Sequence, residues 1–394
     1  MPTTDPIVIL AARRTPMGAL LGVLSAASAP QLGSAALRAA LEECRVPGSS
    51  VDQVIMGCVL SAGLGQAPAR QAALGAGLPQ GTLALTINKM CGSGMQAVML
   101  AADQIHAGSA KIVAAGGMES MSNAPYLLTK TRAGYRLGHQ QVLDGMFYDG
   151  LQSPWDGQLM GTFADATAAK YGFTRTAQDE FAVESLRRAR HAMDSGAFKA
   201  EIAACSVQSR KAAVSVDRDE IPGTLDPAKI PTLKPAFKKD GTVTAASSSS
   251  IADGAAAVIV TLQSVAASMQ LKVLARIAGF AGHAREPEWF TVAPVDAIRK
   301  ALAAAGWRTG DVDLYEINEA FAVVTMAAIR DLGLDPAKVN VNGGACALGH
   351  PIGASGARII STLVHALAAR GLKRGIAALC IAGGEATAIA IELA

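Results

Sequence analysis

Cys91 is the residue of this 394-residue chain best placed for nucleophilic chemistry. It lies in the run NKMCGSG (88–94), between an apolar stretch that ends at Ile87 and a helical pattern that continues to Gly108. Free backbone N–H groups and the positive end of a helix dipole favour a thiolate at such a turn, and the glycines let a substrate approach the sulfur. A buried structural cysteine is the alternative interpretation.

Three residues in the second half of the chain lie on comparable turns. His350 stands in GHPIGASG (349–356), directly before a predicted helix over about 354–369, and a histidine held rigidly there suits general-base work. Asn318 ends a predicted strand, where an asparagine that caps a helix together with Glu319 is the alternative. Cys380 ends an apolar strand and is followed closely by a pair of glycines.

Together these residue types favour acyl transfer combined with carbon–carbon bond chemistry. One thiolate can form an acyl-enzyme, but joining or breaking a bond next to a thioester also needs a base for the α-proton and donors for the enolate oxygen. Two cysteines suit these two tasks, whereas a protease needs only one nucleophile and one base.

Composition excludes several other classes of protein. The chain is 51% hydrophobic and 17% charged with a net charge of +3, and it has no basic block with interleaved aromatic residues, so we expect no nucleic-acid partner. No apolar run reaches the roughly 18 residues of a membrane span, and the first residues lack the order of a signal peptide, which predicts a cytoplasmic protein. The six cysteines lack metal-ligand spacing, so we expect free thiols, no metal and no redox cofactor.

Alternating strand and helix patterns must position the four turns. Strands are predicted over 7–11, 54–59, 111–115, 257–261, 273–279 and 376–379, and helices over 31–45, 161–171, 176–195 and 295–306. Thr176 is a predicted helix N-cap, and the Ala-rich stretch 249–264 opens with a helical pattern. The alternation argues for a parallel or mostly parallel sheet covered by helices.

The second half of the chain repeats the first. At one constant offset, Leu37, Ala40, Leu41, Val51 and Asp52 align with Ile298, Ala301, Leu302, Val312 and Asp313, and AAGGME (114–119) resembles IAGGE (381–385). We therefore predict two packed α/β halves whose strand ends converge on one site. The first half covers 1–122 and is completed by about 243–270, a loop domain with scattered basic residues (Arg210 and Lys211 among them) covers 123–242, and the second half covers 271–394.

The sequence resembles the thiolase family along essentially its whole length. Five motifs carry the resemblance, in the family's order and spacing: NKMCGSG (88–94), GGMESMS (116–122), NEAF (318–321), GHPIGASG (349–356) and CIAGG (380–384). The resemblance implies a five-layered αβαβα thiolase fold with an inserted loop domain, in a homotetramer built as a dimer of dimers. It also implies acetyl-CoA C-acetyltransferase activity in lipid metabolism, in which two acetyl-CoA condense reversibly to acetoacetyl-CoA and CoA with no further cofactor.

The same resemblance implies a role for each residue of the site. Cys91 is acylated while His350 accepts its proton, and Cys380 takes the α-proton of the second acetyl-CoA. His350 and a water held by Asn318 form one oxyanion hole, and the N–H groups of Cys91 and Ala382 form the other. The residues that match CoA or acyl contacts are Ser249, Ala245, Ser248, Leu151, Met160, Phe237, Ala320 and Phe321.

Three features depart from the family pattern. Ala382 stands where many relatives have glycine, Leu159 stands where short-chain biosynthetic relatives often carry histidine, and the stretch 221–230 is short, so no residue is matched to the adenine or the phosphates. A thiolase for longer 3-ketoacyl-CoA substrates is therefore one alternative. A decarboxylating ketoacyl synthase and a non-catalytic CoA-binding protein on the same scaffold are the others.

Overall fold

One mixed β-sheet of ten strands runs through the structure, a computed structural model that describes residues 5–208 and 212–394. The strand order is β12-β13-β14-β11-β1-β10-β5-β3-β4, and the short β2 pairs with β10. The strands are β1 (Ile7–Arg14), β2 (Gly18–Ala19), β3 (Gln53–Gly57), β4 (Leu83–Ile87), β5 (Ile112–Ser120), β10 (Ala252–Leu262), β11 (Ala275–Ala284), β12 (Leu314–Ile317), β13 (Arg374–Ile381) and β14 (Glu385–Leu393).

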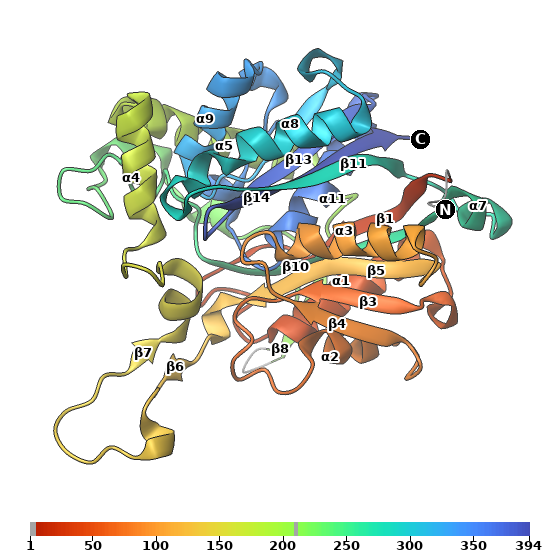
Figure 1. Cartoon of the computed structure of the whole chain (residues 1–394), viewed down its shortest axis with the longest axis horizontal. Coiled ribbons are helices and arrows are strands. Elements are labelled where there is room, and N and C mark those ends of the chain that lie inside the picture. The colour runs from red at the N-terminus through yellow and green to blue at the C-terminus, as the bar shows by residue number, and fades with distance from the viewer. Residues whose placement is uncertain (1–4, 209–211) are drawn as a thin grey trace.

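Five layers are stacked around two central helices, α3 (Ser93–His106) and α11 (Ser355–Arg370) (Figure 1). These helices share a buried core with one face of both halves of the sheet. Helices α1 (Ala29–Cys44) and α2 (Pro68–Gly75) cover the outer face of the first half, and α8 (Ala293–Ala305) and α9 (Ala322–Leu332) cover that of the second. The predicted αβαβα order is confirmed.

The strands next to the central helices are buried on both faces. In β5, Ile112 and Ala114 pack in the core with α1, whereas Val113 and Ala115 pack in the core with α3. Such strands lose the alternation of apolar and polar residues. The helical interpretation of the opening of 249–264 is wrong for this reason, because its Ala-rich run belongs to β10, where small side chains let α1 pack closely.

The expectation of a mostly parallel sheet is also wrong. Strand β3 pairs in parallel with β4 and β5, and β12 with β13, but β10 and β14 run antiparallel to their neighbours. Strand β14 follows β13 after three residues, a connection too short for the crossover between parallel strands. A smaller error concerns α5 (Arg175–Ser195), which is capped by Thr174 and not by Thr176.

Two aspartates show the internal repeat directly. Asp52 Oδ2 accepts hydrogen bonds from two successive backbone N–H groups at the start of β5, at 2.7 and 3.0 Å. Asp313 Oδ2 does the same at the start of β13, at 3.0 and 2.9 Å. The aligned glycine pairs differ, because residues 116–117 lie inside β5 whereas residues 383–384 form the turn after β13.

Most of the segment between β5 and β10 lies outside the layered core. It contains α4 (Met160–Tyr171), α5, α6 (Ile221–Thr224) and a projecting hairpin of β6 (Tyr126–Leu127) and β7 (Leu143–Asp144) (Figure 1). The domain bounds drawn from the sequence stay a prediction, and Arg210 and Lys211 lie outside the described residues. Within the described ranges, no helix combines the length and the apolar character needed to cross a membrane.

A buried ion cluster joins β1 to the segment before β10. The guanidinium of Arg14 hydrogen-bonds to Glu201 at 2.8 Å and to both carboxylate oxygens of Asp219 at 2.7 and 2.9 Å. All three side chains are at most 1% exposed. Removal of the arginine would leave two carboxylates in the interior without their countercharge.

We therefore expect Arg14→Met to lower the free energy of unfolding by about 3–5 kcal/mol, because it breaks a buried ion pair on one side only. Urea unfolding measures this value. The control is Arg187→Met, which removes an exposed pair with Glu184 and should leave the value unchanged within the error of the measurement, because exposed ion pairs contribute little to stability. Equal changes in the two variants would contradict the prediction.

Candidate active site

The turn between β4 and α3 holds Cys91 in a fixed position. Met90, directly before it, has a left-handed backbone with a φ of 47°, a strained conformation for a residue other than glycine. The hydroxyl of Ser93 stabilises the turn by donating to the carbonyl of Met90 at 2.6 Å. A Cβ on Gly92 would lie 2.3 Å from the side chain of Ile381, so glycine at this position lets the turn approach β13.

The sulfur of Cys91 lies among backbone N–H donors. Burial raises the pKa of its thiol to about 11, and hydrogen bonds from the N–H groups of Ala382 and of Cys91 itself offset only part of that shift. The backbone donors act in the direction expected at a helix start, but burial has the larger effect on this partly exposed thiol. The balance favours the neutral thiol, so Cys91 needs a base before it can attack.

Alanine at position 382 fits its turn without backbone strain. The left-handed conformations fall on the next two residues, Gly383 with a φ of 95° and Gly384 with a φ of 90°, and Ala382 is not among the described residues with positive φ. The departure from the family's glycine therefore leaves the N–H of Ala382 in place at the sulfur of Cys91.

Cys380 is the second thiol of the site. It lies near the end of β13, fully buried in an apolar cluster with Phe290, Phe321 and Val324. Burial, and next the neighbouring Cys91, raise the pKa of the Cys380 thiol well above its ordinary value. This thiol is also neutral at rest, and its thiolate would be a strong base.

His350 has one ring nitrogen that is held by a hydrogen bond and one that is free. It follows α10 (Ala345–Leu348), it is 6% exposed, and its Nδ1 lies 2.5 Å from the hydroxyl oxygen of Ser355. That hydroxyl donates to the carbonyl of Pro351 at 3.0 Å, so its oxygen accepts the hydrogen on Nδ1. Burial, and next the charge of Arg358, lower the pKa of His350 to about 3. The ring is therefore neutral, with a free lone pair on Nε2.

Asn318 lies beside the strand that carries Cys380. Its backbone N–H donates to the carbonyl of Ala378 at 3.0 Å. The alternative of a helix N-cap is wrong for this residue, because α9 begins at Ala322 and Phe321 occupies the cap position. Asn318 Nδ2, like His350 Nε2, is buried without a hydrogen-bond partner among the described residues, which leaves both atoms able to bind an oxygen of a substrate or a water.

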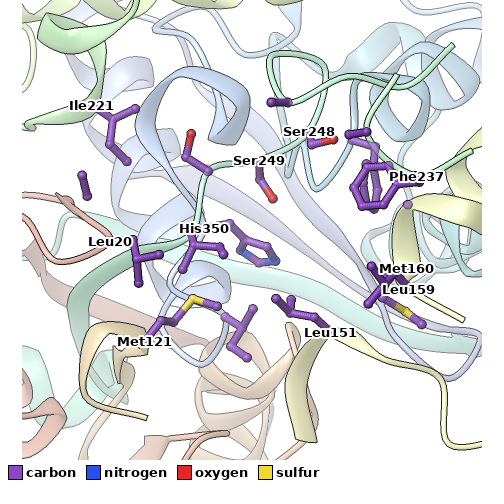
Figure 2. A pocket seen from close by; sticks show the side chains of 18 of the residues that line it. Leu20, Met121, Leu151, Leu159, Met160, Ile221, Phe237, Ser248, Ser249 and His350 are labelled. Carbon is purple, nitrogen blue, oxygen red and sulfur yellow. The ribbon is translucent and has the colours of Figure 1, made fainter. Parts of the chain in front are cut away.

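A cavity of about 510 Å³ opens at His350, whose imidazole points into it between Ser249 and Leu151 (Figure 2). The lining includes seven of the residues matched to substrate contacts: Leu151, Met160, Phe237, Ala245, Ser248, Ser249 and Phe321. Ala320 does not line the cavity, but its carbonyl accepts the N–H of Ser249 at 2.9 Å. Leu159 is part of the wall, which is mostly apolar.

Glu119 is a buried carboxyl to which the sequence analysis assigned no role. It accepts backbone hydrogen bonds from Val59 and Leu60, both at 3.0 Å, and from Gly353 at 2.8 Å. Burial raises its pKa to about 7. Glu119 thereby ties the turn of His350 to the loop after β3, and a lone acidic residue in an otherwise apolar strand was the sequence signal for it.

The described part of the chain contains no group of three or more histidine, cysteine, aspartate or glutamate side chains arranged to hold a metal ion. The groups that the site offers include two thiols, an imidazole, an amide and two backbone N–H groups. They point to the class of thiol-dependent acyl-transfer enzymes.

Comparison with known proteins agrees with this class. The family model of the thiolase N-terminal domain matches residues 7–264, and that of the thiolase C-terminal domain matches residues 271–393. The chain is 50% identical to acetyl-CoA acetyltransferase 2 of Arabidopsis thaliana over 98% of this chain and 97% of that protein. It is 49% identical to the acetyl-CoA acetyltransferase of Escherichia coli over 98% of both chains.

Solved structures show the same fold. The acetyl-CoA acetyltransferase of Bacillus anthracis superposes with a TM-score of 0.97 at 40% identity, over 100% of both chains. A thiolase of Ascaris suum, solved in complex with coenzyme A, superposes with a TM-score of 0.93 at 42% identity, over 99% of this chain and 100% of that one. The chain belongs to the thiolase family.

The state of the nucleophile can be tested with iodoacetamide, which alkylates thiolates. We expect the alkylation rate of Cys91 to rise about tenfold per pH unit from pH 7 to pH 9.5 without levelling off, because its pKa is about 11. Mass spectrometry of the Cys91 peptide follows the reaction, with Cys91→Ser as the control. A plateau near pH 7 would show that the resting thiol is already ionised.

Proposed function

We propose that this protein is an acetyl-CoA C-acetyltransferase, an acyltransferase that condenses two acetyl-CoA reversibly to acetoacetyl-CoA and CoA through an acetyl-Cys91 intermediate. One observation carries the proposal. His350, with a free Nε2, lines one apolar cavity, Asn318 keeps a free Nδ2, and the thiols of Cys91 and Cys380 lie close enough for Cys91 to raise the pKa of Cys380, with two backbone N–H donors at the sulfur of Cys91.

In the first half-reaction, Cys91 attacks the thioester of acetyl-CoA and gives its proton to His350 Nε2. The N–H groups of Cys91 and Ala382 bind the tetrahedral oxyanion, and each such donor typically contributes about 3–4 kcal/mol. The C–S bond to CoA then breaks, and the departing CoA sulfur takes the proton of Cys380. This step leaves acetyl-Cys91, an imidazolium and a Cys380 thiolate.

In the second half-reaction, the Cys380 thiolate removes an α-proton from a second acetyl-CoA. The imidazolium of His350 and a water held by Asn318 bind the enolate oxygen. The enolate carbon attacks the carbonyl of acetyl-Cys91, and the Cys91 sulfur leaves and takes back the proton from His350. All three groups return to their neutral state, and thiolysis of acetoacetyl-CoA is the reverse sequence.

Several finer points belong to the same proposal. The protein uses no cofactor besides its CoA substrates, it acts in the cytoplasm in lipid metabolism, and it assembles as a homotetramer. The resemblance to thiolases supports the tetramer, which size-exclusion chromatography with light scattering would measure.

The intermediate is tested first by mass spectrometry of the Cys91 peptide after mixing with acetyl-CoA. We expect acetylation on Cys91 in the wild-type protein and none in Cys91→Ser. In Cys380→Ala we expect slower acetylation, because the departing CoA sulfur must then take its proton from the imidazolium of His350. We expect Cys380→Ala to lower acetoacetyl-CoA formation at least about 1000-fold, because it removes the base for the α-proton.

The same variants separate the alternatives. Full activity of Cys380→Ala with a decarboxylating substrate would favour a ketoacyl synthase. A wild-type protein that binds CoA without forming an adduct, or that is acetylated on Cys346 or Cys205 instead, would favour a non-catalytic scaffold.

Chain length is tested by the rate of thiolysis of 3-ketoacyl-CoA substrates of increasing length. We expect the highest kcat/KM with acetoacetyl-CoA. For each pair of added methylenes that the cavity cannot bury, kcat/KM should fall about tenfold or more, since one methylene changes the binding of the transition state in such a pocket by roughly 1–3 kcal/mol. An optimum at six carbons or more would assign the protein to the thiolases for longer substrates.

A further inference from the structure

Arg358 is a buried arginine directly behind Asn318. It lies in the first turn of α11, 1% exposed, and its Nη2 donates to Asn318 Oδ1 at 3.4 Å. Glu316 of β12, 2% exposed, faces it with 3.8 Å between Nη1 and Oε2. Buried ion pairs can often be replaced by apolar residues of similar volume without loss of stability. Packing therefore does not account for a charge at this position.

These three side chains keep unused hydrogen-bonding capacity inside the protein. Asn318 Nδ2, Arg358 Nε and Nη1, and Glu316 Oε1 are buried without a hydrogen-bond partner among the described residues. The neighbouring Glu319 differs, because it accepts three hydrogen bonds at 2.7, 2.8 and 3.1 Å. Buried polar groups of a structural frame are normally satisfied. The unsatisfied hydrogen-bonding atoms of Asn318, Arg358 and Glu316 therefore indicate a role in the neighbouring active site.

The position of the guanidinium suits an enolate. A cation at the amide oxygen of Asn318 polarises the amide, which makes its Nδ2–H groups stronger donors. The same charge acts on His350, whose pKa is lowered by burial and next by Arg358. His350 and Asn318 are the two groups predicted to hold the enolate oxygen, and Arg358 lies behind them. Its fixed positive charge stabilises the negative charge that develops on that oxygen, and no group has to reorient during the reaction.

We propose that Arg358 is a positioning residue for enolate formation: it holds and polarises Asn318, and Glu316 holds Arg358. This inference rests on the proposed function, because it assigns Arg358 to one half-reaction of that mechanism. The first attack uses the N–H groups of Cys91 and Ala382 and does not involve Asn318. His350 takes part in both half-reactions, but burial and not Arg358 is the larger cause of its lowered pKa. The two half-reactions should therefore respond differently to loss of the guanidinium.

The test measures the two half-reactions separately. Acetylation of Cys91 by acetyl-CoA, followed by mass spectrometry, reports the first, and exchange of the α-hydrogens of acetyl-CoA for deuterium in D₂O reports the second. We expect Arg358→Met to keep the acetylation rate within about threefold and to slow α-hydrogen exchange about 10- to 100-fold, by analogy with the loss of a hydrogen-bond partner behind a metal-binding side chain. Arg358→Lys should recover part of the exchange rate because it keeps the charge, and Glu316→Gln should slow exchange by a smaller factor.

Arg370→Met is the matched control. Arg370 lies on the same helix and also donates to an asparagine oxygen, Asn342 Oδ1, at 2.9 Å. Unlike Arg358 and Asn318, neither is among the described residues with a buried polar atom that lacks a hydrogen-bond partner. We expect its two half-reactions to be unchanged. An equal loss of both half-reactions in Arg358→Met, or the same selective loss in Arg370→Met, would overturn the proposal.

Urea unfolding identifies any variant that fails to fold. If Arg358→Met does not fold, an exchange rate equal to that of the wild type in both Arg358→Lys and Glu316→Gln would overturn the proposal. A wild-type protein that neither acetylates Cys91 nor exchanges α-hydrogens would refute the proposed function instead.

Discussion

Close contact between backbone segments at the centre of the molecule is the constraint on which the active site depends. A Cβ on Gly117 would lie 1.9 Å from the carbonyl oxygen of Gly353, and a Cβ on Gly356 would lie 2.3 Å from a backbone nitrogen of α3. No side chain fits at such distances, so β5, α3 and α11 approach as closely as their backbones allow. Cys91 precedes α3 and His350 precedes α11, and the contact therefore sets the distance between nucleophile and base.

Burial gives the site its chemical character as well as its geometry. The packing around Cys91, Cys380 and His350 disfavours the charged form of each, most completely for the buried Cys380 and His350 and less so for the partly exposed Cys91. Cys91, Cys380 and His350 then become charged only when a proton moves from one group to another. In the low dielectric of the interior, fixed dipoles interact strongly with these charges. The backbone N–H of Ala382 and the amide of Asn318 are such dipoles, held by the turn after β13 and by the end of β12.

The fold class and the candidate site residues could both be predicted from the sequence, but the direction of the strands could not. Cys91, His350, Cys380 and Asn318 could be singled out because glycine-rich turns and strand ends are local patterns, and their roles stay a prediction. The direction of β10 and β14 could not be found in this way, because strand direction depends on pairing between distant segments and Ala-rich buried strands lack a period of two. The rise that burial causes in the pKa of Cys91 could not be predicted either, since that burial comes from residues far away in the chain.

The internal repeat explains how a stable frame and an asymmetric site coexist. Asp52 and Asp313 perform the same task in the two halves, each fixing the start of a central strand through two backbone N–H groups. The far ends of those strands have diverged. In the first half the glycine pair continues β5 and lets the turn of His350 pack against it, whereas in the second half Gly383 and Gly384 reverse the chain and leave Ala382 N–H at the nucleophile. The two halves thus share the interactions that stabilise them, whereas the different ends of β5 and β13 position the groups of the active site.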